Sequence, residues 1–161
     1  MDKHIYFFGS YNPFSNWYKC KFKDSGLEFN CVEQYMMYQK AMLFKDYEIA
    51  NKILNSSYDP KLYKSLGRKV KGFNIERWDK WKEQIVYTGC YLKFTQNKDL
   101  KEKLLNTVGY ELVEASPYDK IWGCGLFESD VRIKDKSNWT GLNLLGDILT
   151  ELRDDILKEE I

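Results

Sequence analysis

Histidine is almost absent from this chain. The 161 residues include a single histidine, His4, close to the N-terminus. Ser-His-Asp and Cys-His catalysis would both depend on that one side chain, and zinc sites would lack their usual imidazole ligands. No cluster of carboxylates stands out as a site for a harder cation. We therefore expect no metal and no cofactor, and chemistry that uses carboxylates, lysine or aromatic rings.

Long apolar runs and disulfide spacing are missing as well. No run approaches the roughly 18–20 apolar residues of a membrane span, and the first ten residues, M-D-K-H-I-Y-F-F-G-S, contain no signal-peptide core. The cysteines are scattered without a C-x-x-C pair. These absences predict a reduced, cytoplasmic protein that does not enter the membrane.

The chain also lacks a large excess of either charge. Lys and Arg total 25 against 24 Asp and Glu, which gives a formal net charge of +1. Tight non-specific binding to nucleic acid needs a larger basic excess. Basic residues do outnumber acidic ones over residues 61–82, which suits a phosphate-bearing small molecule or the end of a nucleic acid. A solvated helix face explains the same band equally well.

The residues that are present are typical of a globular protein, with 43% hydrophobic and 30% charged residues. The length fits one domain over residues 1–161. We expect strands over residues 4–8, 17–23 and 110–115. We expect helices over residues 31–44, from Asp59-Pro60 to Gly67, from Asn74 to about residue 94, over 99–106 and over 142–158, with Asn30 as the first N-cap and Gly67 as a C′ residue. This pattern predicts an α+β fold, mostly helical around a small β-sheet.

The segment E-Q-Y-M-M-Y-Q-K, residues 33–40, is the first candidate site. Positions seven apart on a helix differ by only about 20° in direction, so Glu33 and Lys40 share one face. An acid and an amine on one face can serve a single cleft. The plain alternative is that Glu33 is the capping-box acid of an Asn30 cap and that Lys40 is a surface lysine.

Two further segments carry candidate ligand contacts. In G-R-K-V-K-G-F, residues 67–73, glycine permits close approach of the backbone and Arg68 offers a bidentate fork for phosphate; Trp78 follows soon after. The alternative is a helix C-cap and a basic turn. In W-T-G-L-N-L-L-G, residues 139–146, Asn143 either caps the last helix or points into a cleft.

The segment E-A-S-P-Y-D-K-I-W-G-C-G, residues 114–125, combines a strand end, a proline, an acid, an indole and a Gly-Cys-Gly turn. This composition is typical of a loop shaped for a ligand. Asp119 and Trp122 are its candidate residues. The alternative is that Trp122 closes the edge of the core and Asp119 caps a turn.

These segments together resemble the NADAR, or YbiA-like, family. The matching pieces are F-F-G-S-Y-N-P-F-S-N-W-Y (7–18), E-Q-Y-M-M-Y-Q-K-A (33–41), G-R-K-V-K-G-F (67–73), L-V-E-A-S-P-Y-D-K-I-W-G-C-G (112–125) and W-T-G-L-N-L-L-G-D-I-L (139–149). They occur in the family's order over nearly the whole chain. Gln34 departs from the pattern, because many relatives have histidine there.

The resemblance implies an N-glycosidase that cleaves the bond between ribose C1′ and a nitrogen. Its substrates would be phosphorylated ribosyl compounds: ribosylamino-pyrimidine intermediates of riboflavin synthesis, or guanine bases carrying ADP-ribose. The implied catalytic residues are Lys40, as a Schiff-base nucleophile, with Glu33 and Asp119. The implied substrate-binding residues are Asn16, Trp17, Arg68, Trp78, Trp122, Gly123 and Asn143.

Two non-catalytic hypotheses stand beside this one. A sensor module would bind ADP-ribose or a related nucleotide and would be stabilised by it without forming a product. An interaction protein would use the same motif residues structurally, so that changes at Glu33 or Asp119 would lower stability rather than remove an activity. The sequence leaves the oligomeric state and the choice between the two substrates open.

Overall fold

The structure, a computed structural model, describes residues 3–160 and consists of two compact units. The terminal unit comprises residues 1–15 and 98–161, and the central unit comprises residues 16–97. Helices predominate, and the strands form two-stranded sheets. The predicted α+β class, mostly helical with little sheet, is confirmed.

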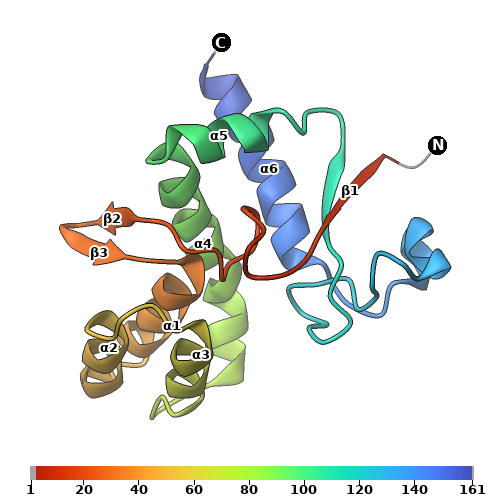
Figure 1. Ribbon diagram of the computed structural model, residues 1–161. Helices are drawn as coiled ribbons and strands as arrows, with labels where there is room; N and C mark the ends of the chain where they lie inside the picture. The colour runs from red at the N-terminus through yellow and green to blue at the C-terminus, as the bar shows by residue number, and fades with distance from the viewer. Residues whose placement is uncertain (1–2, 161) are drawn as a thin grey trace. The chain divides into compact units, whose positions relative to one another are not determined.

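The terminal unit is built on a parallel strand pair. Strand β1 (His4–Phe7) pairs with β4 (Glu111–Glu114), with His4 opposite Glu111 and Phe7 opposite Glu114. The unit also contains α5 (Lys98–Leu105), the short helices η1 (Val131–Lys134) and η2 (Lys136–Asn138), and α6 (Leu144–Glu159). Helix α6 packs along β4 (Figure 1), because its apolar face, which includes Leu145, Leu149 and Leu152, is buried.

Side chains of α6 hydrogen-bond the backbone of β4. The hydroxyl of Thr150 accepts from the backbone N–H of Leu112 at 3.0 Å. Gly146 lies so close to the strand that a Cβ built there would overlap the carbonyl oxygen of Leu112. A glycine inside a helix is normally unfavourable, so the close approach of helix and strand explains why it is tolerated here.

Replacement of Gly146 by alanine tests this contact. In an open helix the change would stabilise by about 1 kcal/mol. Here we expect a loss of about 3 kcal/mol or more in the free energy of unfolding, because the methyl group meets backbone rather than a flexible side chain. Chemical denaturation measures the loss, and exposed Glu151→Ala on the same helix is the control. Unchanged stability in Gly146→Ala would contradict this packing.

The central unit surrounds one helix with three others. Helix α1 (Val32–Leu43) packs against α2 (Tyr47–Leu54), α3 (Pro60–Arg68) and α4 (Ile75–Thr95), and a hairpin joins β2 (Phe22–Asp24) to β3 (Leu27–Phe29) (Figure 1). Most of α1 is buried, including Met36 and Met37. Both methionines therefore belong to the core.

The strand predicted over residues 17–23 is wrong for most of its length. Regular strand begins only at Phe22, and the chain pairs with itself through a two-residue turn. Ser25 and Gly26 both have positive φ, of 53° and 84°, which is the requirement of a type I′ hairpin turn. This turn, β3 and α2 (Tyr47–Leu54) were not predicted from the sequence.

Two predicted helix caps are corrected by the structure. Cys31, not Asn30, is the N-cap of α1: its sulfur accepts the backbone N–H of Gln34. Gly67 lies inside α3 rather than at its C′ position, and a Cβ at this residue would overlap the sulfur of Met37 on α1. The glycine thus serves helix packing, whereas the caps at Asp59 and Asn74 are confirmed.

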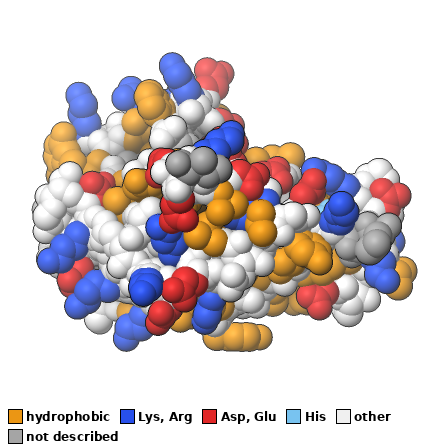
Figure 2. Space-filling model, turned by 90° about the horizontal axis from the view of Figure 1, so that it is seen from above, with side chains coloured by type: hydrophobic (Ala, Val, Ile, Leu, Met, Phe, Trp, Pro, Cys, Tyr) orange, Lys and Arg blue, Asp and Glu red, His pale blue; other side chains and the backbone are white. Residues whose placement is uncertain are grey.

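The surface carries charges of both signs. Figure 2 shows basic and acidic side chains interspersed on the face in view, in keeping with the net charge of +1. Among residues 3–160, no helix combines the length and the apolar character needed to cross a membrane.

Candidate active site

The amine of Lys40 lies in an aromatic setting within the central unit. Its Nζ is 4.6 Å from the centre of the Phe73 ring and 5.5 Å from the Trp78 ring. Lys40 is half-buried near the end of α1, and Trp78 comes from the first turn of α4. The two rings are therefore placed to hold the ammonium by cation–π attraction and to limit its contact with water.

Burial lowers the pKa of Lys40 below its ordinary value of 10.5. The charge of Glu33 acts in the opposite direction, and the nearby guanidinium of Arg68 adds to the lowering. Desolvation is the largest cause because it penalises only the charged amine. A larger share of neutral amine, which is the nucleophilic form, follows at any given pH.

The segment between α3 and α4 brings Phe73 to Lys40. Lys71 donates its backbone N–H to a carboxylate oxygen of Asp46 at 2.9 Å, which fixes the segment to the start of α2. Gly72 follows with a φ of 76°, a conformation that favours glycine. Phe73 then packs edge-on against Phe44, with ring centres 5.4 Å apart. These contacts explain why the motif G-R-K-V-K-G-F ends in an aromatic residue.

Glu33 is not the capping-box acid. With Cys31 as N-cap, the third helical position belongs to Gln34, whose side-chain oxygen accepts the backbone N–H of Asn30 at 2.8 Å. Glu33 is only 5% exposed, and its own backbone N–H donates to the carbonyl of Asn16. The Glu33 carboxylate is therefore buried outside the capping position, and its charge raises the pKa of Lys40 on the same helix.

Gln34 has a structural role that accounts for its departure from the family pattern. Its side-chain N–H donates to the carbonyl of Ile53 at 3.0 Å, while its oxygen accepts from Asn30. The side chain is fully buried and ties α1 to the end of α2. It is thus engaged in packing the helices.

In the terminal unit, the loop of residues 116–125 is braced by the segment that leads into α6. The backbone N–H groups of Gly141, Asn143 and Leu145 donate to the carbonyls of Cys124, Gly123 and Trp122 at 2.9, 3.0 and 3.1 Å. Gly123 is buried where a Cβ would crowd the carbonyls of Asp119 and Glu114. Two sequence motifs far apart in the chain therefore form one rigid loop pair.

This bracing explains why Asn143 does not cap α6. The first amides of the helix donate to carbonyls of Ile121 and Trp122, so no side-chain cap is needed. Asn143 instead accepts the N–H of Glu114 at 2.9 Å and adopts a left-handed backbone with φ of 53°. Of the two alternatives that the sequence left open, the side-chain cap is thus wrong, and the buried side chain joins the start of α6 to β4.

Asp119 organises the loop. Its Oδ1 accepts the backbone N–H groups of Ile121 and Trp122, both at 2.9 Å. This is the turn-capping role that the sequence left open as an alternative. Within residues 3–160, the other oxygen, Oδ2, makes no hydrogen bond or ion pair. The carboxylate is thus oriented by one oxygen, and the second stays available for a ligand.

The structure thus gathers part of the predicted set within each unit. In the central unit, Lys40 is influenced by the charges of Glu33 and Arg68 and contacts the ring of Trp78. The backbone carbonyl of Asn16 accepts from the start of α1, and the carbonyl of Trp17 accepts the hydroxyl of Tyr58. Asp119, Trp122, Gly123 and Asn143 meet in the terminal unit. Phe73 was missed, although it ends a motif that the sequence singled out. Among the described residues, no group of three or more His, Cys, Asp or Glu is arranged to hold a metal ion.

A family model described as the NADAR domain matches residues 6–157. The chain belongs to the NADAR family. A solved structure, the NMR structure of the E. coli protein YbiA, is similar to it with a TM-score of 0.81 and 28% identity, over 99% of this chain and 88% of that one. The fold and the family predicted from the motifs are thereby confirmed.

Two known proteins are similar in sequence to this chain. An N-glycosidase of Acanthamoeba polyphaga mimivirus is 42% identical over 165 residues, covering 96% of each protein. Protein irg-1 of Caenorhabditis elegans is 43% identical over 136 residues, which are 83% of this chain and 64% of that longer protein. The name of the first relative confirms the predicted enzyme class, hydrolysis of N-glycosyl compounds.

The pH dependence of a NADAR reaction that uses Lys40 follows from its surroundings. With the neutral amine as nucleophile, we expect the rate to rise as pH rises through the pKa of Lys40, so the rising limb of the rate–pH profile lies below the ordinary lysine value of 10.5. Arg68→Met removes a cation that lowers this pKa, so the limb moves to higher pH; Glu33→Gln moves it to lower pH. Rate–pH profiles measure both, with Arg77→Met as the control. A limb that stays in place in both variants would contradict the assignment.

Proposed function

We propose that this chain is an N-glycosidase that hydrolyses the C1′–N bond of a phosphorylated ribosyl substrate with Lys40 as nucleophile. The observation that carries the proposal is the half-buried amine of Lys40, whose pKa burial and Arg68 lower, on the same helix as the buried carboxylate of Glu33. An ordinary lysine is neutral in only about one molecule in 2,500 at pH 7. The surroundings of Lys40 reduce that obstacle.

The proposed reaction proceeds in three balanced steps. Opening of the C1′–O4′ bond, with a proton delivered to O4′ by a carboxylic acid, leaves C1′ as an iminium carbon on the base nitrogen. The neutral amine of Lys40 adds to C1′; the base nitrogen takes a proton and departs, which leaves a Schiff base between Lys40 and the sugar. Water adds to the Schiff base, and hydrolysis releases the sugar and regenerates the amine of Lys40.

Glu33 and Asp119 are the groups we assign to proton transfer and charge stabilisation. A positioned carboxyl group typically contributes about 10²–10⁴ in rate to such a step. Glu33 is buried on the helix that carries Lys40, and Asp119 presents an oriented free oxygen, Oδ2. We assign binding of the substrate, or support of its site, to Arg68, Asn16, Trp17, Trp78, Trp122, Gly123 and Asn143.

ADP-ribose attached to guanine is the substrate that we favour, and ribosylamino-pyrimidines of riboflavin synthesis are the second. The near-zero net charge suits recognition of a single modified base rather than binding along a long duplex. The cysteines are free thiols, which suits a reducing setting such as the cytoplasm.

Base release from each substrate tests the proposal. The protein is incubated with an ADP-ribosylated guanine oligonucleotide or with a phosphorylated ribosylamino-pyrimidine, and products are separated by liquid chromatography and weighed. We expect restored guanine in the first case or free pyrimidine in the second. Thermal stabilisation by ADP-ribose without any product from either substrate would instead favour a sensor module.

A further inference from the structure

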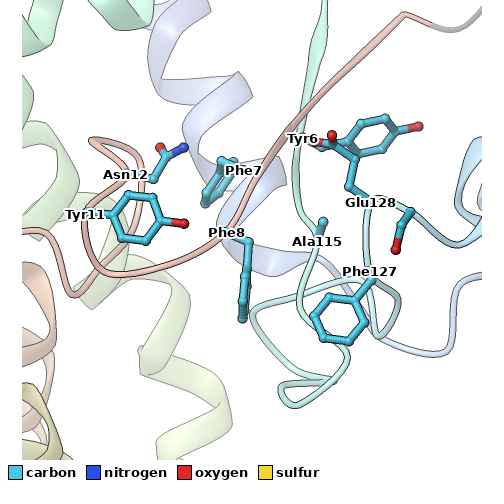
Figure 3. A pocket seen from close by; sticks show the side chains of 9 residues that line it. Tyr6, Phe7, Phe8, Tyr11, Asn12, Ala115, Phe127 and Glu128 are labelled. Atoms are coloured by element: carbon cyan, nitrogen blue, oxygen red, sulfur yellow. The ribbon is translucent and has the colours of Figure 1, made fainter.

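The two units contain aromatic clusters of different kinds. In the terminal unit, rings such as Phe8 and Phe127 line a cavity of about 450 Å³ (Figure 3), and none of the described residues that line it is a lysine or an arginine. In the central unit, the rings of Phe73 and Trp78 lie at the amine of Lys40 instead. The central cluster is thus the one placed to act on a reactive amine.

Phe73 rests on the last turn of α1. Lys40 and Phe44 are four residues apart and therefore lie on the same face of the helix. Phe44 is the C-cap, and its backbone N–H donates to the carbonyl of Lys40 at 3.2 Å. The centre of the Phe73 ring is 4.6 Å from Nζ of Lys40 and 5.4 Å from the centre of the Phe44 ring. One ring thus covers both the amine and its neighbour.

The segment that carries Phe73 has little packing of its own. Each of residues 71–77 is exposed, and Phe73 itself is 43% exposed. The Asn74 side chain accepts the backbone N–H of Arg77 and so caps its own helix, α4, without tying the segment to another element. A segment so exposed needs an anchor outside itself to hold the ring in place.

Asp46 provides this anchor and uses both carboxylate oxygens. Oδ1 accepts the backbone N–H of Ile49 at 3.1 Å and caps α2, while Oδ2 accepts the backbone N–H of Lys71 at 2.9 Å. The bond from Lys71, followed by that from Ile49, holds the pKa of Asp46 below its ordinary value of 3.8. The carboxylate therefore stays charged, and keeps both bonds, at the neutral and alkaline pH at which a lysine acts as a nucleophile.

Two tight turns connect this anchor to the ring. Lys45 has a φ of 61°, in the left-handed region, and the backbone N–H of Asp46 donates to the carbonyl of Ala41 at 2.8 Å. The corner after α1 is thus folded back on the end of that helix. On the other side of the bond, Gly72 has a φ of 76°, which turns the chain directly before Phe73. The anchor and the ring are therefore joined over a short path.

We propose that Asp46 is a positioning residue for the nucleophile: by holding the backbone of Lys71, it keeps the Phe73 ring over the amine of Lys40. Asp46 acts through the ring rather than on the substrate. The ring restricts the direction of the amine and limits its contact with water. The inference rests on the proposed function, in which Lys40 is the nucleophile, and adds to it a residue that lies outside the sequence motifs.

Asp46→Ser tests the bond to Lys71 apart from the helix cap. Serine is about as good an N-cap as aspartate, so it still accepts from Ile49, but its single short hydroxyl leaves the N–H of Lys71 unbonded. Asp59→Ser is the matched control. Asp59 caps α3 by accepting the backbone N–H of Leu62 at 3.1 Å, and within residues 3–160 its side chain makes no second hydrogen bond.

The position of the ring is read from the NMR signal of the Lys40 ε-methylene group in protein made with isotope-labelled lysine. The signal is assigned by its loss in Lys40→Arg, and an aromatic face displaces it upfield. Phe73→Leu gives its position without that face. We expect Asp46→Ser to move the signal most of the way to this position, whereas Asp59→Ser leaves it in place. In the double variant, Asp46→Ser adds nothing to Phe73→Leu, because the two residues act in series.

Turnover separates positioning of the amine from general support of the fold. We expect kcat for base release to fall about ten-fold in Asp46→Ser while KM changes less than about two-fold, because the amine is misdirected and the binding of substrate is not altered. Asp59→Ser keeps the wild-type values. The thermal midpoints of the two variants stay close to each other, since both retain a helix cap.

Three results would overturn the inference: a Lys40 signal that stays at its wild-type position in Asp46→Ser, an equal displacement in Asp59→Ser, or wild-type kcat in Asp46→Ser. The outcome separates from that of the proposed function. A displaced signal in a protein that releases no base would leave Asp46 as the support of the Phe73 ring and refute the glycosidase. Base release together with an unmoved signal would do the reverse.

Discussion

Replacement of Lys40 by alanine is expected to reduce base release by about 10³-fold or more, the scale seen when an enzyme loses its nucleophile. In the proposed reaction the amine forms the new bond to C1′, and no other residue of the assigned set can form a Schiff base. Product release measured over hours, with enough enzyme to detect a residual rate, gives the ratio.

The loss is expected without unfolding. Lys40 is half-buried near the end of α1, and its contacts with the Phe73 and Trp78 rings are worth about 1 kcal/mol. Alanine is also the best helix former. The thermal midpoint of Lys40→Ala therefore stays near that of the wild type. Lys64→Ala, an exposed lysine on α3, is the matched control and keeps full activity. Wild-type turnover by Lys40→Ala would remove the amine from the mechanism.

Asp119→Asn is expected to lower turnover by about 10²–10⁴ while the loop stays intact. The asparagine oxygen still accepts the backbone N–H groups of Ile121 and Trp122, whereas the negative charge and the basic Oδ2 are gone. Asp119→Ala removes both functions, and we expect an additional loss of about 1–2 kcal/mol in the free energy of unfolding.

The pair of variants separates catalysis from loop support. Asp135→Asn is the control, because Asp135 accepts from the backbone N–H and the hydroxyl of Ser137 in the same unit and lies outside the motifs. Activity should survive there. Full activity in Asp119→Asn, together with a stability loss in Asp119→Ala, would make Asp119 a purely structural residue.

The parts of the fold that the sequence predicted well are those with local signals. The apolar face of the last helix places α6, and Asp59-Pro60 and Asn74 place the starts of α3 and α4, because each cap acts within its own turn. The missed elements depend on weaker or non-local cues. The hairpin of β2 and β3 turns through Ser25 and Gly26, which form a poor sequence signal beside the more typical Asn-Gly.

The candidate site was predictable as a set of motifs but not as contacts. Gly67 was predicted to end its helix because glycine is common just after helix C-termini. In the structure the glycine leaves room for Met37, a residue of another helix, which the local sequence could not indicate. A cap was one alternative for Asn143 because it precedes the last helix; the structure needs no such cap, because carbonyls from a loop about twenty residues earlier accept the first amides of α6. Phe73 carried no chemistry of its own, and only the fold sets its ring beside the amine of Lys40.

The most direct test of the central claim is to trap the Lys40 Schiff base. The protein is mixed with an ADP-ribosylated guanine oligonucleotide in the presence of cyanoborohydride, which reduces an imine to a stable amine, and the intact protein is weighed by mass spectrometry. We predict an added mass of reduced ADP-ribose that maps to Lys40 and is missing from Lys40→Ala. Base release at the normal rate with no adduct on any lysine would contradict the covalent mechanism.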